Sequence, residues 1–144
     1  MTAADLKRFP LLVELSDDDR EALFDLLEPQ SFRPGRSVFR ETAEADSLVF
    51  IVAGTVRLSS QRRADLGTLG EGTVLGGAAL LAMGQREATA KAEDACEVLV
   101  LHRTAYRRLV EDYPRTACRL TEAIAQDLAA LLREVLDPLT GAVG

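Results

Sequence analysis

Residues 75–92 read Leu75-Gly-Gly-Ala-Ala-Leu-Leu-Ala-Met-Gly-Gln-Arg-Glu-Ala-Thr-Ala-Lys-Ala92. The pattern predicts a glycine-marked turn, one short helical turn, a polar loop, and Arg86 leading into a strand. Backbone N–H groups at the start of a helix lack partners within it, and an arginine facing them can neutralise an anion. The stretch is therefore typical of a phosphate-binding cradle, although two glycines followed by an arginine are weakly specific by themselves.

The composition predicts one globular domain spanning residues 1–144. Of the 144 residues, 47% are hydrophobic and 28% are charged, and the net charge is -6. This length can bury a hydrophobic core, and the acidic balance disfavours a general nucleic-acid surface. The sequence contains neither a secretory signal nor the apolar run of about 20 residues that a membrane span needs. We therefore expect a cytoplasmic protein without membrane contact.

Two cysteines and one histidine are the residues that a catalytic or metal site would use. Cys96 and Cys118 stand in apolar surroundings without neighbours at metal-ligand spacing, so both are expected to be small buried hydrophobes. His102 ends an apolar strand and has no acid or nucleophile near it in the sequence. The sequence thus predicts neither a metal site nor an enzyme.

The N-terminal segment, residues 1–29, predicts short helices. A first helical turn carries Leu6 and Phe9 and is expected to stop at Pro10. A second helix begins after Ser16, which can cap free N–H groups, and is expected to end at Pro29.

The central segment, residues 30–102, predicts short strands separated by glycine and proline turns. Such regular spacing is typical of a closed β-roll or jelly roll, which the cradle at 75–92 interrupts. We expect strands at Phe32, 38–39, 48–52, 56–58, 66–69, 74–75, 88–92 and 98–101.

The last segment, residues 104–137, predicts two helices. Thr104 caps the first, and the second runs from about Arg115 to Leu136, with Pro138 and Gly141 after its end. Apolar residues of the second helix recur at the spacings of a coiled-coil seam, which favours a homodimer. The alternative is a helix that packs only on its own barrel. The residues assigned to the dimer seam are Leu120, Ile124, Leu128, Leu131 and Val135.

These elements and several motifs resemble the cyclic nucleotide-binding domain family over nearly the whole chain. The matching motifs are Pro34-Gly35-x-x-Val38-Phe39-Arg40-Glu41, the hairpin at 46–58, Leu69-Gly70-Glu71-Gly72-x-Val74-Leu75-Gly76, the strand at 96–101, and Tyr113-Pro114. The resemblance implies a mainly β fold with flanking helices. Its centre is a β-roll (a double-stranded β-helix, or jelly roll) with N-terminal helices, an internal phosphate-binding cassette at 75–92, and a long C-terminal helix.

The resemblance also implies a ligand site for cyclic AMP or cyclic GMP, with no other cofactor. Gly76 would let the backbone approach the cyclic phosphate, Arg86 would pair with it, and the amides of residues 77–80 would donate to it. The implied ligand-binding residues are Gly76, Gly77, Ala78, Ala79, Leu80, Arg86, Glu87 and Ala88.

Three departures from the family pattern affect this site. Gly77 replaces a glutamate that accepts the ribose 2′-hydroxyl, a loss of about 1.5–3 kcal/mol, or roughly tenfold to hundredfold in affinity. Glu87 replaces a small residue, so it either opposes the anion or pairs with Arg86 and occupies its site. Leu131-Leu132 stand where relatives that read adenine carry hydroxyls. The pocket is therefore degenerate or retuned to a different ligand.

Two functions remain open. The first is a non-catalytic regulatory module that senses a cyclic nucleotide or related ligand weakly or non-canonically and signals through its C-terminal helix. The alternative is a nucleotide-blind domain for dimerisation or protein interaction. Bacterial regulators of this family continue into a helix-turn-helix, whereas this chain ends at Gly144. We therefore expect a homodimer or a protein partner and no direct DNA binding.

Overall fold

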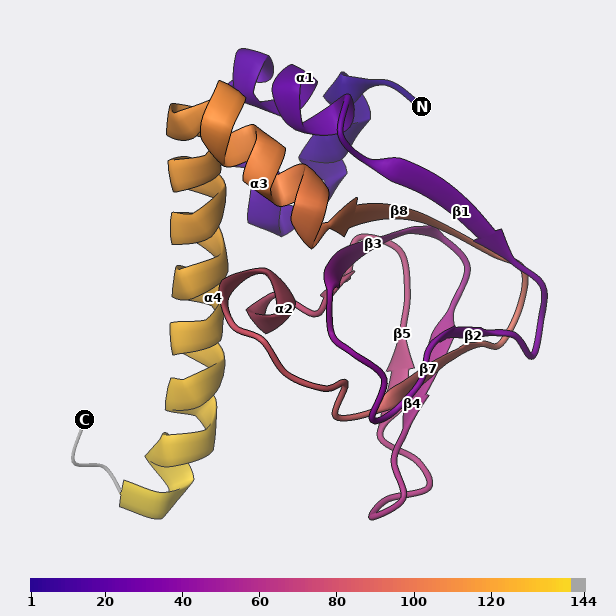
Figure 1. The fold of residues 1–144 in the computed structure, drawn as a ribbon. Coiled ribbons are helices and arrows are strands. Elements are labelled where there is room, and N and C mark those ends of the chain that lie inside the picture. Colours follow the sequence, from indigo (N-terminus) through magenta and orange to yellow (C-terminus); the bar gives the residue numbers. More distant parts are fainter. Residues whose placement is uncertain (141–144) are drawn as a thin grey trace.

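The computed structural model describes residues 1–140, which form a β-roll flanked by helices (Figure 1). Within these residues, two antiparallel sheets of four strands each have the orders β1-β8-β3-β6 and β2-β7-β4-β5. The predicted mainly β fold is confirmed, and each expected strand has a counterpart. The strands are β1 (Glu28–Phe32), β2 (Ser37–Phe39), β3 (Ser47–Ala53), β4 (Val56–Ser59), β5 (Gly67–Leu69), β6 (Val74–Leu75), β7 (Thr89–Ala92) and β8 (Cys96–His102).

Helices cover one end and one side of the roll. Figure 1 shows α1 and α3 above β8 and β3, while α4 runs along the side with the short α2 between it and the sheets. No helix of the described residues is both long and apolar enough to cross a lipid bilayer. The helices are η1 (Ala3–Arg8), η2 (Pro10–Leu12), α1 (Asp17–Phe24), α2 (Ala78–Leu81), α3 (Arg103–Asp112) and α4 (Pro114–Thr140).

The two N-terminal prolines differ: η1 ends at Arg8, before Pro10 as expected, whereas Pro29 does not end a helix. Pro10 begins η2, at the first position of a helix, where the missing N–H would have no partner. The helix α1 ends at Phe24, and Pro29 lies in β1, an edge strand of its sheet. An edge strand tolerates proline because one of its sides pairs with no neighbour.

Two helix boundaries in the C-terminal segment also differ from the expectation. His102, with an extended backbone, is the N-cap of α3, so Thr104 lies inside the helix and does not cap it. The helix α4 does not end at Leu136 but continues through Pro138 to Thr140. A proline this close to a helix end removes only one backbone hydrogen bond. The expected terminator Gly141 lies outside the described residues.

The strand β3 is buried on both faces, and its alternating side chains enter two cores. Leu48 and Phe50 face the helices, where Phe50 meets Phe9 edge to face with ring centroids 5.2 Å apart. Val49 and Ile51 point into the roll. This burial explains why the sequence of β3 is a continuous apolar run instead of an alternating one.

The first half of α4 belongs to the protomer's own core. Leu120 and Ile124 are buried within the single chain, in the core cluster that the helices share with β3 and β8, so neither is exposed for the intersubunit seam to which the sequence assigned it. A spacing of three and four residues marks a buried face without saying which chain covers it. Cys96 is buried as expected, whereas Cys118 is exposed on α4, contrary to expectation.

Asp19 of α1 is hydrogen-bonded to α4. It forms a capping box with Ser16, and its carboxylate accepts hydrogen bonds from Thr116 Oγ1 at 2.6 Å and Arg119 Nη1 at 2.7 Å. Burial by itself raises the pKa of this carboxyl, but the hydrogen bonds from Thr116, Arg119 and Ser16 outweigh burial and lower the pKa to about 2. The ionised form therefore stabilises the contact between the two helices.

We expect Asp19→Asn to lower the free energy of unfolding at pH 7 by about 2 kcal/mol. Because the folded-state pKa is depressed from 3.8 to about 2, this contribution is present above about pH 4 and is lost as the pH falls toward 2. Urea unfolding of both proteins across this range measures the difference, with Asp18→Asn on the exposed side of α1 as the control. A difference that does not change with pH would contradict this account.

Candidate functional site

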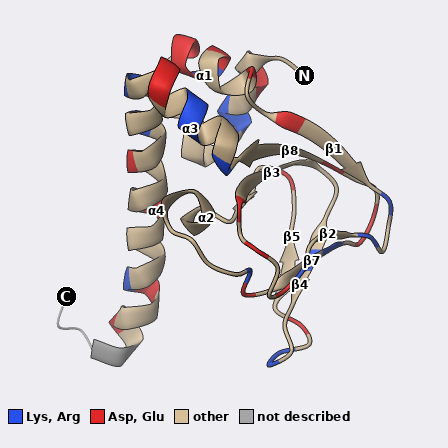
Figure 2. Cartoon of the chain, viewed as in Figure 1, with Lys and Arg blue, Asp and Glu red and all other residues tan. Residues whose placement is uncertain are grey.

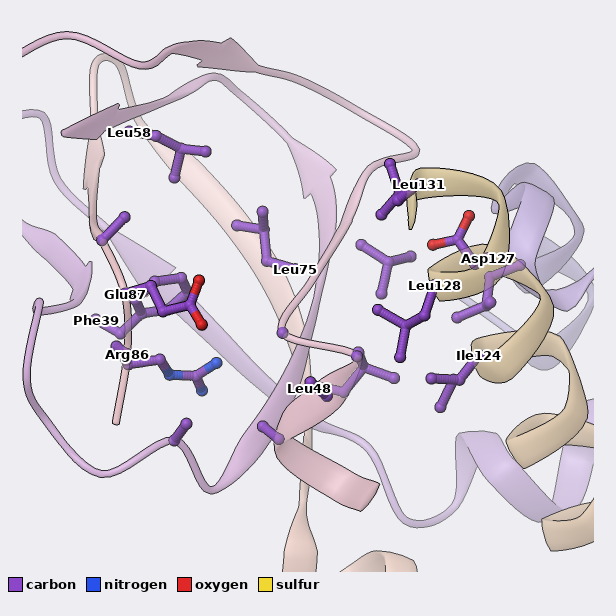
Figure 3. Close-up of a pocket in the computed structure, with 18 of the residues that line it drawn as sticks. Phe39, Leu48, Leu58, Leu75, Arg86, Glu87, Ile124, Asp127, Leu128 and Leu131 are labelled. Carbon is purple, nitrogen blue, oxygen red and sulfur yellow. The ribbon is translucent and has the colours of Figure 1, made fainter. Parts of the chain in front are cut away.

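A cavity of about 340 Å³ lies between the roll, α2 and α4. Figure 3 shows Arg86 and Glu87 on one side of it and Ile124, Leu128 and Leu131 of α4 on the other. This volume falls in the range of about 300–1,000 Å³ that small-molecule sites occupy. Of the predicted ligand-binding residues, Gly76, Gly77, Ala78, Ala79, Arg86, Glu87 and Ala88 line the cavity. Leu80 does not line it and is buried in the core instead.

The turn from β6 into α2 requires a glycine at position 76. Gly76 has φ +86°, which disfavours any residue with a side chain. A Cβ atom there would collide with Arg86 Nη1 and would lie 2.9 Å from the carbonyl oxygen of Ser47. The N–H of Ala79 donates to the Gly76 carbonyl at 2.9 Å, so the amides of Gly77 and Ala78 precede the first bonded turn. Amides at such a position are free to bind a ligand.

Arg86 is built into the wall of the cavity. Its side chain is buried, and Nη2 donates to the carbonyl oxygen and to Oγ of Ser47, both at 2.9 Å. Its guanidinium carbon lies 4.3 Å from the centroid of the Phe39 ring, a cation–π contact. Its backbone is paired with the β2–β3 loop through Arg86 N to Ala43 O at 2.7 Å and Thr42 N to Arg86 O at 2.8 Å.

The charge of Arg86 has no anionic partner within residues 1–140. No carboxylate of the described residues lies at ion-pair distance from it, and its buried Nε lacks a hydrogen-bond partner. Burial lowers the pKa of its guanidinium, Asp46 raises it, and the positive charge of Arg103 lowers it again. A buried cation without a partner is costly, so an anion entering this cavity gains an unusually strong contact.

The charged residues of the site come from outside α2. Figure 2 shows no Lys, Arg, Asp or Glu on α2, whereas acidic residues gather on α1. Arg86 therefore supplies the positive side chain of the cavity, and the short helix can contribute only backbone amides and apolar contacts.

The structure gives a physical reason for the departure at Gly77. Its backbone is helical, and a Cβ atom there would lie 3.2 Å from Ile124 Cγ2 of α4. The missing side chain thus lets α4 lie directly against the cassette. A glutamate at this position would require Ile124 to move.

Glu87 and Leu131 also line the cavity, as Figure 3 shows. Glu87 is exposed and, within the described residues, forms no ion pair with Arg86, so it does not occupy the arginine's site in this conformation. Leu131 presents an apolar wall, while Leu132 is exposed outside the cavity.

Sequence reasoning missed three residues of the site. Ser47 and Phe39 hold Arg86, and Asp127 of α4 adds a second carboxylate to the cavity lining. The sequence gives one indication of Asp127, because this residue directly precedes Leu128 of the apolar strip. Ser47 and Phe39 gave no such signal because they reach Arg86 only through the fold.

Replacing Gly76 with alanine is expected to destabilise the protein by more than the roughly 1–2 kcal/mol of left-handed backbone strain, because the new Cβ also displaces Arg86. Gly35→Ala is the matched control, since Gly35 has φ +88° but a Cβ atom there would meet nothing within 4 Å. Chemical denaturation of the two variants isolates the collision with Arg86. Equal losses in both variants would show that Arg86 is not packed against Gly76.

Comparison with known proteins agrees with this geometry. Residues 29–113 match the cyclic nucleotide-binding domain. The chain is 31% identical to cGMP-dependent protein kinase, isozyme 1, from Drosophila melanogaster, over 81% of this chain and 16% of the kinase. It is 28% identical to the cyclic AMP receptor protein of Thermus thermophilus, over 85% of this chain and 59% of that protein. The chain thus spans less than two thirds of either relative.

A solved structure shows the same fold. A cyclic nucleotide-binding domain from Methylobacillus flagellatus superposes with a TM-score of 0.81 at 19% identity, covering 99% of this chain and 86% of that one. This chain belongs to the cyclic nucleotide-binding domain family.

Proposed function

We propose that the protein is a non-catalytic regulatory module that binds a cyclic nucleotide between the roll and α4 and signals through α4. The observation that carries the proposal is Arg86, a buried cation without an anionic partner in the described residues, facing the glycine turn at Gly76. In this arrangement the guanidinium and the amides of Gly77 and Ala78 hold a phosphate. The relatives named above, a cGMP-dependent kinase and a cyclic AMP receptor protein, support a regulatory role.

The remaining lining sets how tightly and how selectively the ligand binds. Leu75, Leu128 and Leu131 offer apolar contacts to a base. Position 77 provides no acceptor for the ribose, and Glu87 places a negative charge at the cavity, so we propose weak binding. Asp127 is a carboxylate that only accepts hydrogen bonds, which favours a base edge with adjacent N–H donors, as in guanine, over one that pairs a donor with an acceptor, as in adenine.

The test is calorimetry with cyclic AMP and cyclic GMP on the wild type and on Arg86→Met. We expect measurable binding to the wild type and a loss of roughly tenfold to hundredfold in the variant, the value of a lost charge-assisted contact. Arg63→Met, in the exposed β4–β5 turn, is the control, and thermal unfolding confirms that each variant is folded. Wild-type binding weaker than about 1 mM for both nucleotides would rule out the sensing role for these ligands.

An exposed strip on α4 supports a second candidate function, dimerisation. Leu131 and Val135 are 51% and 63% exposed, and Leu132 and Leu136 beside them are exposed as well. Exposed apolar residues in one continuous strip mark an interaction surface. We propose that the α4 helix of a second copy of the chain covers these residues. Of the predicted seam residues, the proposed contact then keeps Leu131 and Val135.

Val135→Asp should convert the proposed homodimer to a monomer, because a carboxylate would be buried without a partner at the centre of the contact. Gln126→Glu is the control: Gln126 is exposed and lies nine residues from Val135, on the opposite side of the helix. Sedimentation equilibrium at tens of micromolar protein distinguishes the two states. A wild type that sediments as a monomer would remove the dimer proposal.

A further inference from the structure

Arg103, the first residue of α3, bridges two separate segments of the chain. Its Nη2 donates to the carbonyl oxygens of Ala45 at 2.6 Å and Ala79 at 2.7 Å, and its Nε donates to Ala79 at 3.2 Å. Only 15% of this side chain is exposed, and Glu44 lies 3.8 Å from Nη1. The guanidinium therefore holds a fixed position between α3 and these two carbonyl groups.

Both carbonyl groups belong to residues that line the ligand cavity. Ala79 lies in α2, and Ala45 lies in the loop between β2 and β3. That loop is bound to the other end of the cassette, because the N–H of Ala45 donates to Gly84 O at 2.9 Å and Glu44 forms a β-bridge with Gln85. Arg103 thus contacts α2 directly and the segment before Arg86 through the loop.

The helix α2 needs such an external partner. With Ala78–Leu81 it is a single turn, too short to be stable alone, and the carbonyl groups of so short a helix mostly lack partners within it. A charge-assisted hydrogen bond from Arg103 satisfies one of them at Ala79. The position of α2 is consequently tied to the position of α3.

Arg103 belongs to α3, and α3 packs against α4. Its backbone N–H donates to Asp46 O at 2.8 Å where α3 begins. Further along α3, the hydroxyl of Tyr106 bonds to Thr121 of α4, and Leu109 is buried in one cluster with Leu120. The contacts therefore form one continuous path from Ala79 through Arg103 and α3 to α4.

We propose that Arg103 is the positioning residue that couples the cassette to the α3–α4 pair. Arg103 holds α2 in place without touching the ligand. When the cassette moves, the hydrogen bonds of Arg103 make α3 move with it. The coupling of ligand to helix rests on the function proposed above, whereas the mechanical link between α2 and α3 does not. The two parts can therefore be tested separately.

The mechanical link is tested by hydrogen exchange of the ligand-free protein. In Arg103→Met we expect the amides of α2 and of the first turn of α3 to exchange roughly tenfold to hundredfold faster than in the wild type. Arg107→Met is the control, because Arg107 lies one turn along the same face of α3 but is exposed. Unchanged exchange in Arg103→Met would overturn the proposal, whatever the ligand does. Should Arg103→Met fail to fold, Arg103→Lys carries the test, because lysine keeps the charge but loses the planar donor fork.

The coupling is tested with spin labels on the exposed Cys118 of α4 and on an introduced Gln61→Cys in the β4–β5 turn. In the wild type, saturating cyclic nucleotide should shift the distance between the labels. In Arg103→Met it should bind within about threefold of the wild-type affinity but leave the distance unchanged. A full shift in this variant would overturn the coupling role. A wild type that binds no nucleotide would instead overturn the proposed function and with it the coupling, and the exchange experiment would still decide the link.

Discussion

The candidate site depends on keeping the guanidinium of Arg86 buried with no carboxylate of residues 1–140 at ion-pair distance from it. Ser47 at the start of β3 and Phe39 at the end of β2 hold its position, and Gly76 provides the space in front of it. Burying a cation costs free energy, which the core around β3 and β8 must offset. Within the described residues the β-roll therefore maintains a charge that forms no ion pair, a property expected of a binding site and not of a structural ion pair.

The sequence predicted the elements whose pattern comes from their own burial. The apolar runs of β3 and β8 and the cap at Ser16 are local features, and each is confirmed. The predictions at Pro29 and Pro138 were wrong, since proline is tolerated at a sheet edge and near a helix end, and sequence alone does not identify either place. Leu120 and Leu131 share one helical spacing, but the first is buried by its own chain and the second is exposed.

The residues of the cavity also divide into those that the local sequence indicates and those that only the fold brings together. Gly76 and Arg86 were predicted because they stand within one short stretch whose glycine turn is visible in the sequence. Ser47, Asp127 and Arg103 were missed because they come from other elements. The side chain of Arg103 donates its hydrogen bonds to backbone carbonyls, which every residue has, so no pattern of residue types marks its partners. The predictable residues are those proposed to hold the phosphate, whereas Ser47 holds the side chain of Arg86 and Arg103 holds α2.

The loss of a side chain at Gly77 has two consequences that belong together. In the proposed site it leaves no acceptor for a ribose at position 77, and it lets Ile124 of α4 lie against the cassette. A ligand can move α4 only by binding one arrangement of the helix better than another. In the proposed binding mode a nucleotide is held mainly at Arg86 and makes little direct contact at position 77, so its effect passes through the backbone that surrounds the phosphate. That backbone leads from Gly76 to Ala79, and from the carbonyl group of Ala79 to Arg103.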